Sequence, residues 1–200
     1  CDKFIAFFIS RVELLLRFGI HPVLVFDGGS MPCKADTDAA RKERRAAARA
    51  EVTDLWQRGM RDEAMKIMER AVEISTDVAL AVIEVLWERF PDVEVVVAPF
   101  EADAQLAYLG KEGYIHAVIS EDSDLIAYNC GLLLAKLDGN GHCEALRLRD
   151  LPSLAPMANL SRDAFLMACV LSGCDYLPSL PGVGMKTALK LVAAQQSALS

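Results

Sequence analysis

Residues 98–109 read Ala-Pro-Phe-Glu-Ala-Asp-Ala-Gln-Leu-Ala-Tyr-Leu, and residues 113–124 read Gly-Tyr-Ile-His-Ala-Val-Ile-Ser-Glu-Asp-Ser-Asp. In each segment a pair of acidic residues follows a short apolar run that is typical of a buried strand. The pairs are Glu101 with Asp103 and Asp122 with Asp124, and the runs are 93–97 and 117–119. Because ligands bind beyond the strand ends of a parallel α/β sheet, this pattern predicts a site there.

Further carboxylates stand at comparable places along the chain. Asp27 follows the apolar run 23–26, and Asp175 follows a helix predicted at about 161–172. Gathered carboxylates repel one another unless a cation or protons compensate, and ligand sets made only of oxygen suit hard ions such as Mg²⁺ or Mn²⁺. Acidic residues also favour the first turns of helices, which is the alternative explanation for any single pair. Two pairs with matching acids elsewhere favour the metal interpretation.

The segments around the acidic stretch alternate between strands and helices. The pattern predicts helices at 4–18, 101–111, 161–172 and 185–196, strands at 23–26, 93–97, 117–119 and 132–137, and a turn at 138–141. This order predicts an α/β fold with a largely parallel central sheet, right-handed crossovers and helices on both faces. The helical region 34–90 is long for one crossover, so we expect its first part to project from the core.

Composition excludes several classes of protein. The chain has 200 residues and is 53% hydrophobic, which allows a sizeable core, yet no apolar run approaches the length of a membrane span. The net charge of −7 argues against a uniformly basic nucleic-acid binder but permits basic patches beside an acidic centre. The cysteines form no C-x-x-C and the histidines lie far apart, so we expect no zinc site and a reducing, intracellular environment.

Two further segments have the chemistry to bind phosphate. Basic side chains gather within 34–49 on an Ala-rich helix, where they could neutralise phosphates or simply form a solvated face. Leu-Pro-Gly-Val-Gly at 180–184, followed by Lys186, forms a glycine hairpin before a helix. The glycines allow backbone N–H groups to approach a phosphate, and a plain turn between helices is the alternative.

Together these motifs resemble the structure-specific 5′ nucleases, the family of flap endonucleases, the xeroderma group G repair nuclease and exonuclease 1. The resemblance covers residues 4–192 and is closest to the exonuclease 1 branch. It rests on Val-Phe-Asp-Gly at 25–28, Met-Pro-Cys-Lys at 31–34, Ala-Pro-Phe-Glu-Ala-Asp-Ala-Gln at 98–105, Glu-Asp-Ser-Asp at 121–124, Leu-Ser-Gly-Cys-Asp-Tyr-Leu-Pro at 171–178 and Pro-Gly-Val-Gly at 181–184.

The resemblance implies a DNA-repair enzyme that hydrolyses phosphodiesters with two Mg²⁺ ions, for which Mn²⁺ would substitute. Its activities would be 5′-to-3′ exonuclease and 5′-flap endonuclease. Lys34 and Arg41 would be catalytic and contact the scissile phosphate. The implied metal ligands are Asp27, Glu101, Asp103, Asp122, Asp124 and Asp175.

The resemblance also implies how DNA is held. The DNA-binding residues would be Arg44, Arg45, Gly182, Gly184 and Lys186, the last three within a helix–two-turn–helix that grips the duplex. In this family that element also holds K⁺, whose implied ligand positions are Ser172, Ser179 and Val183.

The implied domain organisation is a PIN-like nuclease core at 1–150, with a helical arch inserted at about 31–75, and a DNA-binding helical region at 151–200. The family's N-terminal strand, with its metal-binding Asp, is missing here and the C-terminal region is cut short, so we expect this fragment to be weak or inactive. The implied partners are DNA with 5′ ends, nicks, gaps or 5′ flaps, together with mismatch-repair proteins, in the nucleus.

Four alternatives remain at this point. A haloacid-dehalogenase-type phosphatase needs a second Asp two residues after Asp27, where this chain has Gly29. A non-enzymatic DNA-binding scaffold would need the basic segment and the hairpin but not six carboxylates. A flap endonuclease or a Holliday-junction resolvase of the same family would differ in substrate rather than in chemistry.

Overall fold

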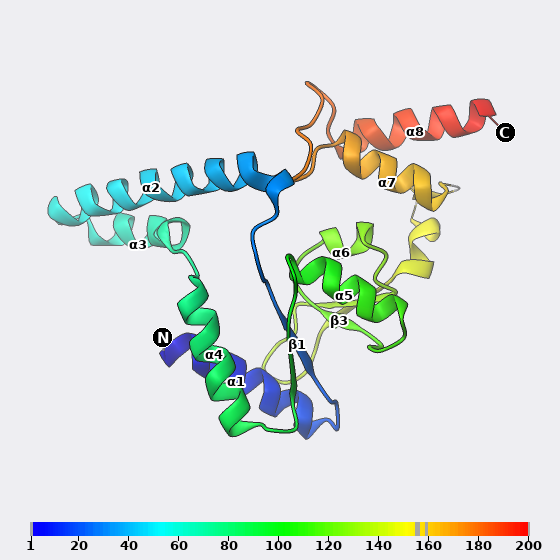
Figure 1. Cartoon of the computed structure of the whole chain (residues 1–200). Helices are drawn as coiled ribbons and strands as arrows, with labels where there is room; N and C mark the ends of the chain where they lie inside the picture. The colour runs from blue at the N-terminus through cyan, green and yellow to red at the C-terminus, as the bar shows by residue number, and fades with distance from the viewer. Residues whose placement is uncertain (1, 155–156, 159, 200) are drawn as a thin grey trace.

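The computed structural model describes residues 2–154, 157–158 and 160–199, which form a mixed α/β fold (Figure 1). The helices are α1 Asp2–Arg17, α2 Ala35–Gln57, α3 Arg61–Ala71, α4 Thr76–Arg89, α5 Ala102–Lys111, α6 Asp124–Ala127, α7 Arg162–Leu171 and α8 Met185–Leu199, with short 3-10 helices η1 Pro32–Lys34 and η2 Leu148–Ser153. The strands are β1 Val23–Phe26, β2 Glu94–Val97, β3 Val118–Ile119, β4 Leu132–Ala135 and β5 Glu144–Arg147.

The first sheet pairs β1 with β2 in parallel, with Val23 opposite Glu94 and Phe26 opposite Val97. Helices α1 and α4 pack beside it, as Figure 1 shows. Their contact is a buried cluster of branched and long apolar side chains, Val12, Val82, Leu86 and Val93. Burying side chains of this kind contributes roughly 1.5–3 kcal/mol each, and Leu24, Phe26 and Val95 of the two strands pack against this cluster.

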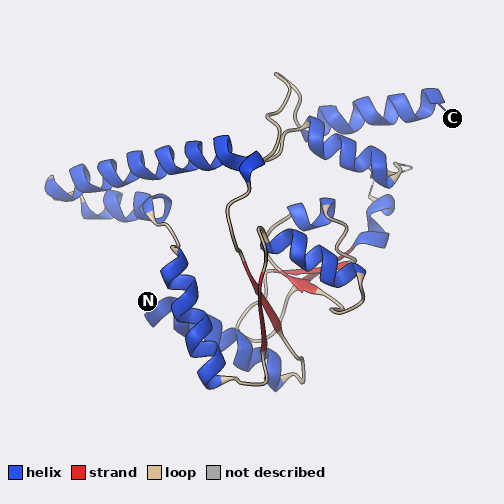
Figure 2. Cartoon of the chain, viewed as in Figure 1, coloured by secondary structure: helices blue, strands red, loops and turns tan. Residues whose placement is uncertain are grey.

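The second sheet has the order β3-β4-β5, with β3 parallel and β5 antiparallel to β4. Val118, Leu125, Cys130 and Leu133 form its buried core, and α5 packs against them through Leu106 and Ala107. Figure 2 shows how small both sheets are beside the helices. Five of the six predicted acidic residues lie in the segments that follow β1, β2 and β3.

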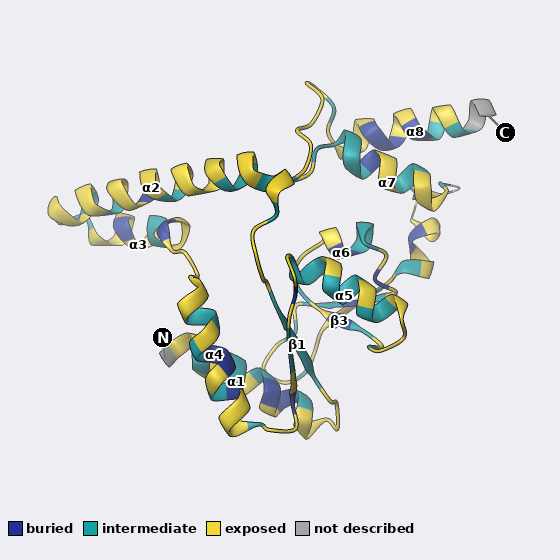
Figure 3. Ribbon diagram, viewed as in Figure 1, coloured by how far each residue is buried: buried dark blue, intermediate teal, exposed yellow. Residues whose placement is uncertain are grey.

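Helices α2 and α3 form a helical arm, residues 35–71, that extends away from both sheets and is largely exposed (Figure 3). Alanines make the close contact between the two helices, since Ala48, Ala64 and Ala71 are buried. On the other side of the molecule, α7 and α8 pack through Ala168, Ala188, Leu189 and Val192. The predicted division into core, arch and DNA-binding region stays a prediction.

The α/β class is confirmed, but the single central sheet expected from the pattern is two separate small sheets. The strands are too short to form one broad sheet, since β3 has only two residues. Strand β5 was not predicted, and the 132–137 run ends at Ala135 because Lys136 turns to a positive φ of 56°. In the described part of the chain, no helix combines the length and apolar character needed to cross a membrane.

Candidate functional site

The predicted acidic residues lie in four loops that the fold brings near one another. Asp27 follows β1, Glu101 is the residue before α5, and Asp103 lies in its first turn. Asp122 and Asp124 follow β3, and Asp175 lies in the loop after α7. Figure 1 shows this loop rising beside the start of α2.

Close backbone contact joins the loop after β1 to the loop after β2. Gly28 N–H donates to the Phe100 carbonyl at 2.6 Å, and Gly29 N–H donates to the Pro99 carbonyl at 3.1 Å. A Cβ atom at Gly28 would lie 1.8 Å from the Ala98 carbonyl oxygen, so only glycine fits. This contact brings Asp27 to the start of α5, where its Oδ1 accepts a hydrogen bond from Ala102 N–H at 2.8 Å.

Asp103 experiences the combined charge of the acidic group. Burial raises the pKa of Asp103 from its ordinary 3.8 to about 6, and repulsion from neighbouring carboxylates adds to the shift. Those neighbours are, in decreasing order of effect, Asp122, Asp27, Glu101 and Asp124. The fold therefore places five of the six predicted carboxylates within electrostatic reach of one another.

The loop after β3 is held in a fixed shape by its own side chains. Asp122 N–H donates to Ser120 Oγ at 3.0 Å, and Asp124 N–H donates to Asp122 Oδ1 at 2.8 Å. Glu121 accepts a hydrogen bond from Lys136 N–H at 2.7 Å, which ties the loop to the end of β4. Burial and then repulsion from Asp122 raise the pKa of Asp124.

The sixth carboxylate, Asp175, is paired with the basic residues of the arm. A tight turn in which Cys174 and Leu177 exchange backbone hydrogen bonds presents Asp175 at its tip. Asp175 Oδ2 lies 3.0 Å from Lys34 Nζ and 2.7 Å from Arg41 Nη2. Burial would raise the pKa of Asp175, but the hydrogen bond and charge of Lys34 outweigh it and lower the pKa.

Lys34 bridges two of the acidic loops. Its ammonium pairs with Glu101 Oε1 as well as with Asp175, and its side chain is only 11% exposed. Burial would lower the pKa of Lys34, whereas the hydrogen bonds to both carboxylates raise it overall. The Thr37 hydroxyl adds a 2.8 Å bond to the Asp175 carbonyl, so the base of the arm is anchored on this loop.

The donor set fits a hard divalent ion, because it consists of carboxylate oxygens whose mutual repulsion a cation would offset. Among the described residues, however, no three acidic, histidine or cysteine side chains surround one point closely enough to ligate an ion. Two of the six acids, Glu101 and Asp175, are instead paired with Lys34 and Arg41. The ligand roles of the six acids remain predictions.

Sequence reasoning missed three residues at this site. Tyr176 donates a hydrogen bond to Glu101 Oε2, and its ring lies 4.7 Å from Lys34 Nζ. The Tyr128 hydroxyl lies 2.7 Å from the Tyr176 hydroxyl, and the Thr37 hydroxyl donates to the Asp175 carbonyl. Only Tyr176 could have been found from the sequence, because it stands directly after Asp175. Tyr128 contacts Tyr176, 48 residues away, and Thr37 contacts Asp175, 138 residues away, so no local pattern indicates either contact.

The remaining predicted residues do not join the acidic group. Arg44 Nε donates to the Ala40 carbonyl within its own helix, and Arg45 Nη2 lies 3.5 Å from Glu73 Oε1 in a half-buried pair. Gly182 has a positive φ of 76°, and a Cβ atom at Gly182 or Gly184 would meet nothing within 4 Å. Lys186 lies in the first turn of α8, beyond the hairpin.

The three positions implied for K⁺ flank the same hairpin. Ser172 donates to the Cys169 carbonyl at 2.8 Å, and Val183 N–H donates to the Leu180 carbonyl at 2.9 Å. Gly173 has a positive φ of 95°, and a Cβ atom there would lie 2.8 Å from Ser179. Gly173 is thus what allows the segments around Ser172 and Ser179 to pack together.

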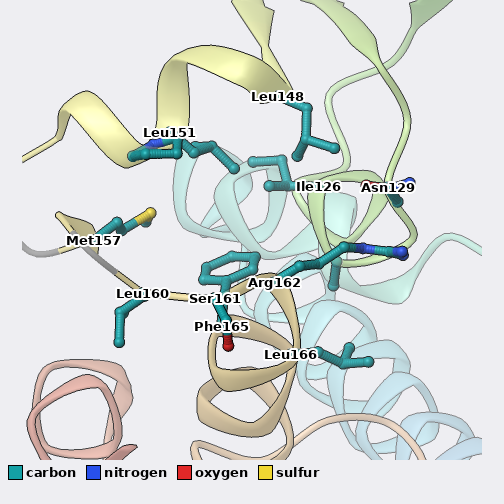
Figure 4. Close-up of a pocket in the computed structure, with 12 residues that line it drawn as sticks. Ile126, Asn129, Leu148, Leu151, Met157, Leu160, Ser161, Arg162, Phe165 and Leu166 are labelled. Atoms are coloured by element: carbon teal, nitrogen blue, oxygen red, sulfur yellow. The ribbon is translucent and has the colours of Figure 1, made fainter. Parts of the chain in front are cut away.

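A separate cavity of about 130 Å³ lies between α6, η2 and α7 (Figure 4). Ile126, Leu148, Leu151 and Phe165 contribute to its mainly apolar lining. No carboxylate lines it, so it is distinct from the acidic loops.

Comparison with known protein families matches two regions of the chain. Residues 1–48 match the XPG N-terminal domain, and residues 92–175 match the XPG I-region. The second match contains five of the six predicted acidic ligands. Exodeoxyribonuclease 1 of Schizosaccharomyces pombe is 38% identical over 190 residues, which cover 94% of this chain and 33% of that protein. The chain thus spans about a third of that relative's length.

Solved structures show the same architecture. The catalytic core of Rad2 in complex with a DNA substrate has a TM-score of 0.67 and 28% identity, over 94% of this chain and 51% of that chain. The eukaryotic junction-resolving enzyme GEN-1 binding with cesium has a TM-score of 0.62 and 26% identity, over 96% of this chain and 37% of that chain.

Proposed function

Since this chain belongs to the XPG family of structure-specific nucleases, we propose that the complete protein is a Mg²⁺-dependent nuclease. It degrades duplex DNA from 5′ ends, nicks and gaps and cuts 5′ flaps. The observation that supports this most strongly is the convergence of acidic strand-end loops with Lys34 and Arg41 at one place. The exodeoxyribonuclease name of the S. pombe relative and the DNA bound to Rad2 support the substrate class.

In this proposal the six acids hold divalent ions, Mg²⁺ or Mn²⁺. When bound, two such ions would supply a water activated for attack and stabilisation of the leaving oxygen. The chain's own contribution is positional: Asp27 is fixed by Ala102 N–H, and Asp122 orients the loop that ends at Asp124. These contacts hold Asp27 and Asp122 in the loops that follow β1 and β3.

Lys34 and Arg41 have a second role in the proposal. In the present geometry they pair with Glu101 and Asp175. Lys34 directly precedes the helical arm, and Arg41 lies near the start of its first helix, α2. A DNA phosphate is a competing anion, so its arrival would draw both cations from the carboxylates onto the phosphate. The cations then stabilise negative charge that grows on the phosphate during hydrolysis.

The hairpin between α7 and α8 grips the duplex backbone without reading sequence. Gly182 supplies the positive φ that this turn requires, and the open space around both glycines leaves the backbone accessible. K⁺ at Ser172, Ser179 and Val183 strengthens the grip, a proposal supported by the cesium bound to GEN-1. The test is DNA affinity at fixed ionic strength with K⁺ exchanged for a large organic cation; unchanged affinity would contradict the ion's role.

Cleavage by the complete protein tests the proposed activity. The substrates are a 5′-labelled flap, a nicked duplex, a blunt duplex and a four-way junction, each with Mg²⁺ or with EDTA. We expect Mg²⁺-dependent cutting of the flap and stepwise degradation from the nick. Preferred cutting of the junction would instead indicate a resolvase, as the similarity to GEN-1 allows. Binding to all four substrates without cutting would indicate a DNA-binding scaffold.

The cellular setting is a further part of the proposal. We place the complete protein in the nucleus, acting in DNA repair together with mismatch-repair proteins. The support is the kinship with eukaryotic exonucleases such as that of S. pombe. Fluorescence microscopy of the tagged complete protein tests the location, and a signal confined to the cytoplasm would contradict it.

A further inference from the structure

One tyrosine contacts both an acidic and a basic residue of the candidate site. The Tyr176 hydroxyl donates to Glu101 Oε2, while Lys34 occupies the other carboxylate oxygen, Oε1. The same Lys34 ammonium lies 4.7 Å from the centre of the Tyr176 ring, within cation–π distance. Tyr176 therefore touches the two groups whose relative placement the proposed chemistry requires.

A second tyrosine fixes the first. The Tyr176 hydroxyl has a single proton, which it donates to Glu101 Oε2. The Tyr128 hydroxyl, 2.7 Å away, must then be the donor to Tyr176. Tyr128 directly follows α6, the short helix that begins at Asp124. The chain Tyr128–Tyr176–Glu101 thus connects the three loops that carry Asp124, Asp175 and Glu101.

We propose that Tyr176 is a positioning residue of the nuclease site, whose hydroxyl orients Glu101 and whose ring guides Lys34, with Tyr128 holding Tyr176 in place. This inference rests on the proposed function. Neither tyrosine contacts the reacting atoms in this role; both act through Glu101 and Lys34.

The local geometry explains why Glu101 needs such a partner. Glu101 stands at the N-cap position of α5, yet its side chain makes no capping hydrogen bond to that helix. Its two described side-chain partners are Lys34 and Tyr176. When Lys34 moves to a DNA phosphate, Glu101 loses its ion pair but keeps the hydrogen bond from the Tyr176 hydroxyl, which holds the carboxylate in its orientation.

Simple packing does not account for Tyr176. The residue is 41% exposed and belongs to none of the buried clusters of the described chain. A half-exposed ring with only a packing role does not require a hydrogen bond from its hydroxyl to a carboxylate, such as the one from Tyr176 to Glu101. The hydroxyl is thus the group to test.

The experiment compares Tyr176→Phe, Tyr128→Phe and Tyr176→Leu in the complete protein. Tyr114→Phe is the matched control, because Tyr114 is exposed and also donates to a glutamate, Glu94, at 2.6 Å. Glu94 is the first residue of β2, at the end of that strand opposite to the loop that carries Glu101. Single-turnover cleavage of a 5′ flap gives the rate, and binding in EDTA gives the DNA affinity. Calorimetric titration with Ca²⁺ measures the ion site without cleavage.

We expect Tyr176→Phe to slow cleavage about tenfold and to weaken Ca²⁺ binding, because a hydrogen bond to a charged group is lost. DNA affinity should stay within about twofold of wild type, since phosphate contacts elsewhere set it. Tyr176→Leu should be slower still, because it also loses the ring beneath Lys34. Tyr128→Phe should show a smaller loss, and Tyr114→Phe none.

The outcomes separate this inference from the proposed function. Equal rates and equal Ca²⁺ affinities in Tyr176→Phe and Tyr114→Phe would overturn the positioning role. If wild type cuts no DNA, the proposed function fails, and the Ca²⁺ titration alone decides the role of Tyr176. If Tyr176→Phe proves less stable than Tyr114→Phe, the Tyr128→Phe variant becomes the test. Slower cleavage by Tyr128→Phe at the melting temperature of wild type supports the positioning role of Tyr176, and cleavage at the wild-type rate contradicts it.

Discussion

Gly28 shows how a single residue determines where the acidic loops meet. A Cβ atom there would lie 1.8 Å from the Ala98 carbonyl oxygen and 2.9 Å from that of Pro99, both backbone atoms. We therefore predict that Gly28→Ala lowers the free energy of unfolding by about 3 kcal/mol, as in severe overpacking. Chemical denaturation measures it.

Gly110→Ala provides the matched control for Gly28. Gly110 lies inside α5, and a Cβ atom there meets nothing within 4 Å. This variant should be stabilised by at most about 0.5 kcal/mol, because Gly110 is the second-last residue of α5, where the helix preference of alanine counts less than in the interior. Equal stability of the two variants would contradict the close contact at Gly28.

Asp103 should make stability depend on pH when no divalent ion is present. Its pKa rises from 3.8 to about 6 on folding, through burial and then neighbouring carboxylates, so the folded state holds the proton more tightly. Asp103 therefore makes its full contribution to the free energy of unfolding below about pH 4, and that contribution is lost as the pH rises through about 6. Solvent screening reduces the effect to about 1 kcal/mol at neutral pH.

The substitution Asp103→Asn tests this linkage. The variant removes the repulsion between residue 103 and the neighbouring carboxylates. The difference in melting temperature between variant and wild type should therefore be more favourable to the variant at pH 7.5 than at pH 4.5. Asp163→Asn is the control, because Asp163 also lies in the first turn of a helix, α7, outside the acidic loops. The same relative melting temperature at both pH values for Asp103→Asn would contradict the coupling of the carboxylates.

At the scale of elements, the start of α7 is defined by one side chain. Ser161 Oγ accepts a hydrogen bond from Ala164 N–H at 3.2 Å and so caps the helix. Ser161→Ala should cost about 1 kcal/mol of stability. Ser75 occupies the same position before α4 without such a bond, so Ser75→Ala should cost close to nothing. Equal costs in denaturation experiments would show that Ser161 is not a cap.

The base of the helical arm should act on catalysis more than on binding. Lys34 and Arg41 face the acidic loops, whereas Arg44 bonds only its own helix. We predict that Lys34→Ala and Arg41→Ala each slow single-turnover cleavage by about a hundredfold, with DNA affinity little changed. Arg44→Ala is the control and should affect affinity alone. Weaker binding at an unchanged rate for Lys34→Ala would make this residue an anchor instead.

Hydrophobic patterns predicted most elements because periodicity is a local property. The runs at 23–26, 93–97 and 117–119 form strands at nearly the predicted bounds, and acidic residues follow each of them within four positions. Strand β5 escaped prediction because Glu144–Arg147 alternates only weakly and is stabilised by its pairing with β4. Pairing between strands is a tertiary property that no local pattern contains.

At the scale of the whole molecule, the sequence predicted which carboxylates gather but not what compensates them. The local hydrophobic pattern predicts where strands end, and from this we expected Asp27, Glu101 and Asp122 to lie near Asp103, as they do. The ion pairs of Lys34 and the hydrogen bond from Tyr176 to Glu101 join residues 67 to 141 positions apart. Only the folded arrangement of arm, loop and helix brings these partners together.

The most direct test of the central claim is single-turnover cleavage of a 5′-flap DNA by the complete protein carrying Asp124→Asn, in saturating Mg²⁺. DNA affinity is measured alongside, and Asp163→Asn is the control. If the acidic loops carry the chemistry, the rate falls at least about a hundredfold while the affinity stays near wild type. A rate near wild type for Asp124→Asn would contradict the assignment of these loops as the nuclease centre.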